Sequence, residues 1–259
     1  MSSGILNYTF RCLEQTEEIV LHMKDLLIDN SSIKILYASS TPSILPTLQF
    51  WSYDSYSELI KMKFSSSFQS NVMYTLYLTY AANISRDLHG LYISRYVNSE
   101  GKIRTFMTSQ MEPTHARTVF PCVDEPARKA IFHISVIHHE SEKVWGNGEV
   151  ENEITLPDGK IQTYLAPTLN MSTFILALIV APKSDFGCRS DCLVGPTKIK
   201  SRVCGRLDIL PQLAYAEEVA YKALGFFNVY FNITYPLPKI EHFAVPDFGA
   251  GAMENYGEL

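Results

Sequence analysis

A glycine-rich stretch near the end of the sequence places exposed backbone beside a carboxylate. It reads Pro-Asp-Phe-Gly-Ala-Gly-Ala-Met-Glu-Asn-Tyr-Gly over residues 246–257. Because glycine has no side chain, an extended peptide can approach the backbone there and add as a strand. The carboxylate of Glu254 would then be placed to hold a positively charged amine. Composition alone leaves open the alternative of an ordinary glycine-rich loop with a solvated acid.

Cysteine spacing gives a second candidate site. The sequence has five cysteines, an odd number, so at least one is unpaired within the chain. Cys188 and Cys192 lie four residues apart in a stretch that is typical of a loop. A zinc site would need two further ligands, and no matching pair is near in the sequence. We therefore expect either a local disulfide between these two cysteines or two free thiols.

Composition excludes several classes of protein. The chain has 259 residues, of which 46% are hydrophobic, and 22 Lys and Arg stand against 27 Asp and Glu. This length allows a sizeable core, and the hydrophobic content is too high for a disordered chain. The net charge of −5 argues against nucleic acid as a partner. The apolar run over residues 174–181 is far shorter than the roughly 20 residues that span a bilayer.

The elements that must position these groups begin with strands. Up to about residue 185 the apolar residues alternate with polar ones, as over residues 74–80 and 132–136. This period of two is typical of half-buried strands. Leu-Pro-Asp-Gly at residues 156–159 is a hairpin signal between two such strands. The pattern predicts a mainly β, antiparallel domain whose sheets pack face to face.

A different pattern follows Gly205. Apolar residues recur at helical spacing over residues 209–227, with Asp208 as the expected N-cap and Pro211 in the first turn. A strand is expected over residues 240–245. A helix followed by a strand indicates a second domain, so we divide the chain into domains at residues 1–206 and 207–259. The second stretch, about 50 residues, is too short to build a core of its own.

Several blocks of the sequence resemble one enzyme family. Gly-Ala-Met-Glu-Asn at residues 251–255 is similar to the exopeptidase signature of the zinc aminopeptidases related to aminopeptidase N and leukotriene A4 hydrolase. Further blocks match in order, and these cover residues 18–26, 90–96, 120–126, 171–177 and 235–240. The resemblance implies an amino-terminal β-sandwich or saddle domain. The first helix and strands of an incomplete α+β, thermolysin-like catalytic domain would follow it.

The resemblance also implies roles for particular residues. Glu254 would bind the free α-amine of a peptide substrate, and Gln110 and Glu112 would reach the same amine. Gly251 and Ala252 would line the peptide backbone. Oxygens gathered around an ammonium group would restrict binding to the first residue of a peptide.

Other positions in the matched blocks would have supporting roles. Met253 and Met111 would border the pocket for the first side chain, where soft thioethers suit apolar or mixed side chains. Arg117, Asp124 and Glu125 are interpreted as structural ion pairs rather than catalytic groups.

The metal site of the family is where the resemblance stops. The family holds zinc by His-Glu-X-X-His on a helix and a further Glu. The nearest approach in this sequence is His-Glu-Ser-Glu-Lys at residues 139–143, where protonated Lys143 occupies the second ligand position. We expect His138 and His139 to be surface residues. Zinc is thus expected in full-length members, with no catalytic or metal-binding residue and no bound zinc in this chain.

The sequence also bears on location. Five Asn-X-Ser/Thr acceptors, at Asn7, Asn30, Asn83, Asn170 and Asn232, favour a glycoprotein at the cell surface or outside the cell. No secretory signal or membrane anchor is visible, so we expect the native beginning to lie upstream.

These observations lead to one leading function and one alternative. The leading prediction is the amino-terminal portion of a zinc aminopeptidase, which carries the amine-binding residues and is inactive alone. It would bind peptide amino termini weakly or not at all, and it would self-associate through the apolar face of residues 209–227. The alternative is a naturally short, non-catalytic module that binds peptides or a partner. A lectin-like β-sandwich fits the composition but not the ordered matches.

Overall fold

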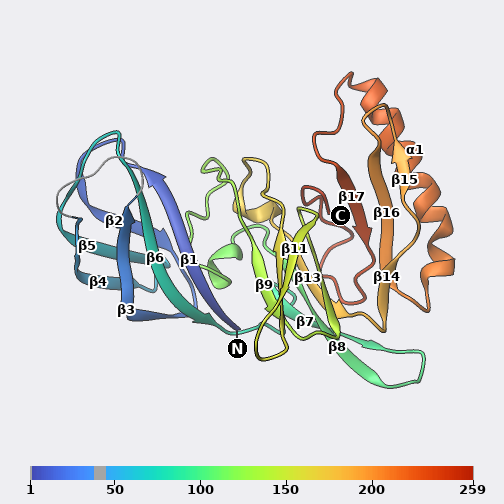
Figure 1. Cartoon of the computed structure of the whole chain (residues 1–259), viewed down its shortest axis with the longest axis horizontal. Coiled ribbons are helices and arrows are strands. Elements are labelled where there is room, and N and C mark those ends of the chain that lie inside the picture. The colour runs from blue at the N-terminus through green and yellow to red at the C-terminus, as the bar shows by residue number, and fades with distance from the viewer. Residues whose placement is uncertain (1, 38–44, 259) are drawn as a thin grey trace. The chain divides into compact units, whose positions relative to one another are not determined.

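The computed structural model describes residues 2–37 and 45–258, which form two compact units (Figure 1). The first unit comprises Met1–Ile84 and Pro113–Arg128, and the second comprises Ser85–Glu112 and Lys129–Leu259. Strands dominate both units, and the single α-helix of the described residues lies near the end of the chain. The predicted fold class, mainly β with one helix near the end, is confirmed. The division into domains at residues 206 and 207 stays a prediction.

The first unit contains two three-stranded antiparallel sheets. Their strand orders are β1-β6-β3 and β2-β5-β4. The six strands are β1 (Ser2–Arg11), β2 (Thr16–His22), β3 (Leu26–Tyr37), β4 (Leu48–Asp54), β5 (Leu59–Phe68) and β6 (Met73–Ala82). Tyr74, Leu76 and Leu78 of β6 share one core cluster with Ile60 and Met62 of β5. The period of two in the sequence therefore correctly predicted β6 and its buried face.

The described residues of the second unit form three further sheets, and two of them are wholly antiparallel. One has the order β10-β13-β8-β7 and the other the order β11-β12-β9. Their strands are β7 (Gly90–Val97), β8 (Ile103–Gln110), β9 (Ser135–His138), β10 (Glu142–Gly146), β11 (Val150–Thr155), β12 (Ile161–Leu165) and β13 (Leu178–Pro182). The strand predicted over residues 132–136 is only partly correct, because β9 begins at Ser135.

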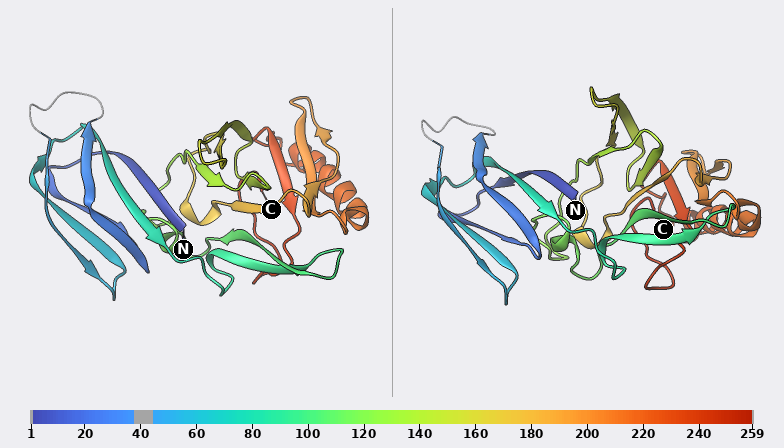
Figure 2. Two further views of the ribbon diagram at one scale, coloured as in Figure 1. Left: turned by 60° about the horizontal axis from the view of Figure 1, so that its bottom comes forward. Right: turned by 90° about the horizontal axis from the view of Figure 1, so that it is seen from below.

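The third sheet of this unit is mixed. Its strands are β14 (Phe186–Cys188), β15 (Cys192–Val194), β16 (Ile199–Arg206) and β17 (Lys239–Phe243). Strand β16 pairs antiparallel with β14 and β15 and parallel with β17. Helix α1 (Ala214–Tyr230) lies against β15 and β16 (Figures 1 and 2). No helix in the described part of the chain is long and apolar enough to cross a membrane.

Short 3-10 helices occur at three places, namely Ala116–Thr118, Thr173–Ile175 and Leu210–Leu213. The last of these precedes α1 and holds Pro211 in its first turn. Asp208 is not the predicted N-cap, because its carboxylate accepts hydrogen bonds from the Arg206 guanidinium. The apolar face of residues 209–227 was expected to be exposed, and Phe227 on it is exposed. The side chain of the next residue, Asn228, accepts a hydrogen bond from the Tyr235 backbone N–H.

The cysteine pairing differs from the local pairing expected. Cys188 lies opposite Cys204 in the register of β14 and β16, and the two sulfurs are joined by a disulfide of 2.00 Å. Cys192 lies opposite Ser201 on β16 and is free. The expected disulfide between Cys188 and Cys192 was wrong. Cys188 lies on β14 and Cys192 lies on β15, and each of them faces a different residue of β16.

An aromatic core connects two sheets of the second unit, the β10-β13-β8-β7 sheet and the mixed sheet. Trp145 packs edge-on against Phe243, which stacks on Phe186. Phe186 in turn contacts Tyr96 and Phe106. These rings come from β10, β17, β14, β7 and β8, and burial of large aromatic side chains contributes strongly to stability. The core therefore fixes β17, from which the glycine-rich stretch continues, relative to β7 and β8.

Candidate functional site

The glycine-rich segment, defined here as residues 247–257, follows β17 and lies mostly on the surface. Gly251 and Ala252 are exposed, and apart from Gly251 itself and its two chain neighbours no heavy atom of the described residues lies within 4 Å of the point where a Cβ of Gly251 would stand. Glu254 is exposed and has no hydrogen-bond or ion-pair partner among the described residues. Met253 is buried and points its thioether inward, away from solvent. The backbone and the Glu254 carboxylate are therefore open to an incoming group.

Gln110 is the last residue of β8 and lies opposite Gly90 of β7. Its side chain is buried, and its Oε1 atom has no hydrogen-bond donor in the part of the chain that the structure describes. A buried amide oxygen without a donor costs free energy, so a ligand that donates there is favoured. Glu112 follows two residues later and is exposed.

The beginning of the glycine-rich segment is fastened to β7. The Tyr92 hydroxyl donates to the Asp247 carbonyl oxygen at 2.8 Å, and the Arg95 backbone N–H donates to the Asp247 carboxylate at 2.8 Å. Burial, and to a lesser extent the charge of Asp247, raises the pKa of Tyr92 to about 12. The hydroxyl therefore keeps its proton and remains a donor at neutral pH.

The end of the segment is held by three side chains. Asn147 Nδ2 donates to the Tyr256 carbonyl oxygen at 2.8 Å, and Lys239 Nζ donates to the Gly257 carbonyl oxygen at 3.1 Å. The Gly257 N–H donates to the Tyr235 hydroxyl at 3.0 Å. Gly257 has φ of +79°, and a Cβ there would stand 2.3 Å from the Asn147 carbonyl oxygen. Only glycine combines this conformation with this close approach.

A buried charge cluster lies beneath this end of the segment. The Lys239 ammonium donates to the Glu241 carboxylate and, at 2.5 Å, to the Gly146 carbonyl oxygen. Arg202 Nε lies 3.4 Å from Glu241 Oε1. Glu258 is buried nearby, and neither of its carboxyl oxygens has a hydrogen-bond partner among the described residues. Burial raises the pKa of Glu258 to about 8, so this carboxyl group is mostly neutral at pH 7.

The predicted amine-binding residues thus lie on two stretches of the chain, the end of β8 and the glycine-rich segment. Both stretches are hydrogen-bonded to β7. Gln110 is paired with β7 at Gly90, and Asp247 is bound to β7 at Tyr92 and Arg95. No hydrogen bond or ion pair joins Glu254 to Gln110 or to Glu112 in the described part of the chain. The amine-binding roles of these residues and the pocket roles of Met253 and Met111, both buried, stay predictions.

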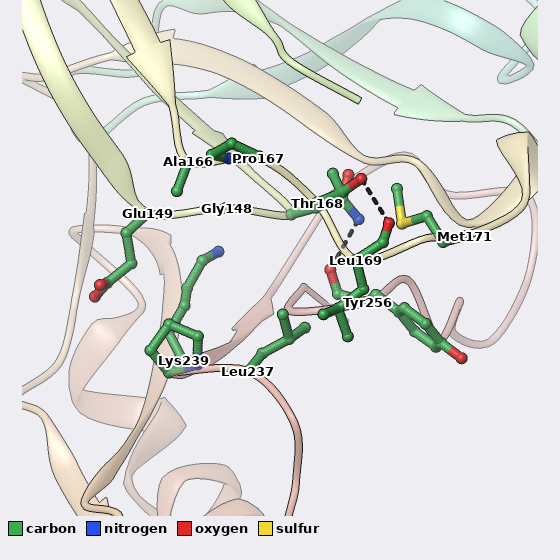
Figure 3. A pocket seen from close by; sticks show the side chains of 12 residues that line it. Gly148, Glu149, Ala166, Pro167, Thr168, Leu169, Met171, Leu237, Lys239 and Tyr256 are labelled. Carbon is green, nitrogen blue, oxygen red and sulfur yellow. Dashed lines mark hydrogen bonds between the residues drawn. The ribbon is translucent and has the colours of Figure 1, made fainter. Parts of the chain in front are cut away.

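A pocket of about 40 Å³ lies close to this segment, but it does not contain the predicted site residues (Figure 3). Its walls come from residues 147–149, 166–169, 237–239, Met171 and Tyr256. A cavity of this size holds a few water molecules and not a peptide side chain. The candidate site is therefore the open surface of the glycine-rich segment.

The described residues do not fit a zinc ion. In that part of the chain, one group of three potential ligands has its ligand atoms within 4.8 Å of one another, namely Cys188, Cys204 and Glu241. The disulfide between the two cysteines uses both thiolates, so neither sulfur is available to a metal.

The histidine prediction needs one correction. His138 was expected on the surface but is buried, with Nε2 2.8 Å from Thr163 Oγ1. It is buried because β9 turns this alternate position toward the interior, as it does Val136. His139 is exposed, as expected. Lys143 lies on β10 with its ammonium 4.9 Å from the Trp145 ring, so the stretch is not on a helix.

Arg117 and Asp124 form the expected ion pair in the first unit. Arg117 Nε donates to Asp124 Oδ2 at 3.0 Å, and Arg117 Nη1 donates to Glu58 Oε2 at 3.0 Å. Glu125, by contrast, is exposed and forms no ion pair with any residue the structure describes. The structural interpretation therefore holds for Arg117 and Asp124 and is wrong for Glu125.

Sequence reasoning missed the residues that hold the segment in place. Tyr92 and Asn147 are far from it in the sequence, and nothing local marks them. Lys239 and Glu241 gave a usable signal, because two charged residues stand in a strand of five residues beside Ile240 and Phe243. Buried charges need partners, so their presence there indicates a polar network.

Comparison with known proteins identifies relatives over almost the whole chain. Residues 1–175 match the peptidase M1 N-terminal domain, and residues 215–259 match the peptidase family M1 domain. The chain is 34% identical to endoplasmic reticulum aminopeptidase 1 of Rattus norvegicus over 246 residues, which cover 94% of this chain and 25% of that protein.

Two other relatives show the same pattern. The chain is 32% identical to endoplasmic reticulum aminopeptidase 2 of Bos taurus over 94% of this chain and 25% of that protein. It is also 32% identical to aminopeptidase Ey of Gallus gallus over 98% of this chain and 26% of that protein. The chain thus spans about a quarter of the length of the curated relatives it matches.

Proposed function

Because this chain belongs to peptidase family M1, we propose that it forms the amino-terminal part of a zinc metallo-aminopeptidase that removes amino-terminal residues from peptides. In this proposal the chain supplies the residues that recognise the substrate's free α-amine. Glu254 contributes a carboxylate, and Gln110 and Glu112 contribute oxygens from the other side. The backbone of Gly251 and Ala252 pairs with the peptide.

One observation carries this proposal. The Gln110 Oε1 atom is buried without a donor, and the Glu254 carboxylate is without a partner in the described residues. Both belong to stretches that are bound to β7. An ammonium group satisfies such acceptors with charge-assisted hydrogen bonds, which an acetylated amine cannot form in the same way.

The chemistry of hydrolysis lies outside these residues. In a full-length family member, a bound zinc ion would supply the Lewis acid for hydrolysis. The donor set described here does not fit that metal, so the role proposed for this chain is to bind and orient the amino terminus. We expect no hydrolysis by the 259-residue chain supplied with zinc, measured with an aminoacyl chromogenic substrate. Turnover that a chelator abolishes would contradict this expectation.

Peptide binding tests the amine site directly. A short peptide with a free leucine amino terminus is compared with its N-acetylated form by isothermal titration calorimetry. We expect at least about tenfold tighter binding of the free amine, and loss of most of that preference in Glu254→Gln. Glu151→Gln, at an exposed position of β11, is the matched control and should behave as the wild type. Equal binding of the two peptides would overturn the proposal.

One observation favours an alternative, a naturally short non-catalytic module that binds peptides or a partner. The Glu254 carboxylate and the backbone of Gly251 and Ala252 are exposed, so they can bind a peptide or a partner by themselves. This alternative predicts the same amine preference but no requirement for a catalytic domain. Messenger RNA that encodes this chain as one open reading frame with a His-Glu-X-X-His motif would eliminate it.

We propose that the protein works in an oxidising compartment, at the endoplasmic reticulum or the cell surface. Relatives are named for the endoplasmic reticulum. The Cys188–Cys204 disulfide is typical of such compartments. The asparagines of all five acceptor sequences are exposed, which suits a glycoprotein, and they are Asn7, Asn30, Asn83, Asn170 and Asn232. A downward shift in mass after peptide N-glycosidase treatment is expected for protein from secretory cells, and an unchanged mass would contradict glycosylation.

We also propose self-association through α1. Phe226 stacks on Tyr230 and Phe227 stacks on Phe231, and we call these four residues the aromatic quartet. Their exposed fractions are 60%, 69%, 49% and 60% in that order. At about 200 Å² per aromatic side chain, roughly 480 Å² of ring surface is exposed. A standard interface buries about 800 Å² per partner. The exposed surface of the aromatic quartet is more than half of that area, and a second copy of this chain would bury it.

A further inference from the structure

We propose that Tyr92 and Asp247 are positioning residues, which fix the glycine-rich segment on β7 and thereby set the separation between Glu254 and Gln110. This inference rests on the proposed function, because it concerns the same amine site. Neither residue would touch the substrate. Their effect would pass through the backbone that they hold.

The first step is that β7 is the common support of both sides of the site. Gly90 of β7 is paired with Gln110, and only two residues later Tyr92 binds Asp247. Leu88, just before the strand, has its Cβ 3.9 Å from the point where a Cβ of Gly249 would stand. Any change in how Asp247 sits on β7 therefore changes where the segment lies relative to Gln110.

The second step is that the segment needs a tether at this end. Gly249 and Gly251 are exposed and give the backbone many accessible conformations. The far end is already held by Asn147, Tyr235 and Lys239. With both ends fixed, the intervening residues, which include Glu254, form a closed loop whose conformational freedom is reduced. Release of the Asp247 end would return that freedom.

The third step is that burial and charge strengthen the hydrogen bonds between Asp247 and β7. Tyr92 is completely buried, so its hydroxyl has little competition from water for the Asp247 carbonyl oxygen. The Asp247 carboxylate accepts a second hydrogen bond from the Arg95 backbone N–H, and charge strengthens that bond. The Ser94 hydroxyl donates a third, longer hydrogen bond to the same carboxylate at 3.5 Å, so three hydrogen bonds from β7 restrain this residue. A displacement of about 1 Å at a binding group strongly weakens its interaction with the ligand. A restraint on the backbone that carries the group therefore preserves binding.

The test uses four variants of the whole chain. Tyr92→Phe removes only the hydroxyl, Asp247→Ala removes the carboxylate, and Asp247→Asn keeps an acceptor for Arg95. Tyr96→Phe is the matched control, because Tyr96 lies on the same strand and its hydroxyl donates to Asp185 at 2.7 Å, away from the segment. Thermal melting checks that each variant folds, and Asp247, an exposed residue, keeps the test available if Tyr92→Phe does not fold.

Two readouts are measured. The first is the ratio of dissociation constants for the acetylated and the free-amine peptide, and the second is hydrogen exchange of the backbone amides of residues 248–254. We expect Tyr92→Phe and Asp247→Ala to lower the ratio about fivefold or more and to speed the exchange about tenfold. Asp247→Asn should retain most of both properties, and Tyr96→Phe should change neither.

The outcomes separate this inference from the proposed function. Exchange that is unchanged in Tyr92→Phe and Asp247→Ala, or equally faster in Tyr96→Phe, overturns the positioning role. A wild-type chain without any amine preference overturns the proposed function, and with it the role of the tether in amine recognition. Faster exchange of residues 248–254 in that case would show only that Tyr92 and Asp247 hold the loop.

Discussion

Glu258 lies opposite Glu241 in a parallel bridge, so two buried glutamates are neighbours in the interior of the second unit. Their situations differ. The Glu241 carboxylate accepts a hydrogen bond from the Lys239 ammonium, whereas the Glu258 carboxyl oxygens have no partner in the described part of the chain. Lys239 also donates to the carbonyl oxygens of Gly146 and Gly257, so its three N–H donors are all used. Lys239 therefore has no N–H donor left for Glu258, and Glu258 is buried in its neutral form.

This arrangement predicts a pH dependence of stability. Burial raises the pKa of Glu258 from 4.5 to about 8, with Lys239 lowering it and Glu241 raising it further. The folded state therefore binds the proton more tightly than the unfolded state does between these two values. We expect the contribution of Glu258 to the free energy of unfolding to be greatest below about pH 4.5 and to be lost as the pH rises toward 8. Urea denaturation across this range measures it.

Glu258→Leu should flatten that profile. An apolar side chain in place of an unpartnered buried acid is expected to raise the free energy of unfolding by about 1–4 kcal/mol near the alkaline end. Glu151→Leu, at an exposed position of β11, is expected to change it by no more than about 0.5 kcal/mol. A Glu258→Leu profile with the same slope as the wild type would show that another group causes the dependence.

Asn147 connects two parts of the second unit by its side chain alone. Besides the Tyr256 carbonyl oxygen, it donates to the Ile175 carbonyl oxygen at 2.9 Å and accepts from the Ala177 N–H at 2.8 Å. Asn147→Ala would remove the side-chain partner of three backbone groups, and the bonds to Ile175 and Ala177 are buried. We expect a loss of about 2–4 kcal/mol in the free energy of unfolding, measured by urea denaturation.

The matched control for this change is Asn152→Ala, at an exposed position of β11. It should stay within about 0.5 kcal/mol of the wild type, because no buried backbone group depends on it. Similar effects of the two alanine substitutions would mean that the hydrogen bonds of Asn147 contribute little.

Arg117 in the first unit is a comparable case with charges. Its guanidinium pairs with Asp124, whose side chain is 1% exposed, and with Glu58. Arg117→Leu would remove the countercharge from a buried carboxylate, and a loss of about 3–5 kcal/mol is expected. Lys63→Met breaks an exposed pair with Glu17 at 3.6 Å and is expected to cost no more than about 1 kcal/mol. Equal losses on denaturation would argue that the burial of the Arg117 pair does not matter.

Local patterns in the sequence predicted the individual strands and the helix better than they predicted which residues contact one another across the fold. The alternation through Tyr74, Leu76 and Leu78 correctly indicated a strand with one buried face, because side chains in a strand point to opposite sides in turn. Pro211 correctly indicated the first turn of a helical region. The helical spacing of apolar residues over 209–227 likewise indicated a helix, and α1 covers Ala214–Tyr230.

Contacts between distant residues could not be predicted in this way. The Cys188–Cys204 pair depends on the register of β14 and β16, which the four-residue spacing to Cys192 does not encode. The bond from Tyr92 to Asp247 likewise joins residues 155 positions apart. The candidate site itself was found from a short run of residues, since Glu254 and its glycines are neighbours in the sequence. What holds that run in place comes from elsewhere in the fold.

The aromatic quartet of α1 gives the last prediction, which concerns association. Helix α1 packs on β15 and β16 by its other face, so Phe226 and Tyr230 point away from the sheet. An exposed apolar patch of this size favours contact with another surface. We expect the weight-average mass of the chain to rise with concentration in the micromolar range, as measured by sedimentation equilibrium.

Charge in the quartet should oppose that association. In the double variant Phe226→Glu and Tyr230→Glu, four carboxylates would face one another across a symmetric contact, so repulsion adds to the loss of apolar area. We expect the dissociation constant to rise at least about tenfold. Tyr56→Glu, at a site 97% exposed in the first unit, adds a charge without touching α1 and should associate as the wild type does. If the wild type stays monomeric, or if the double variant associates equally well, then the quartet is not the contact surface, since both results require that its burial contributes no free energy to association.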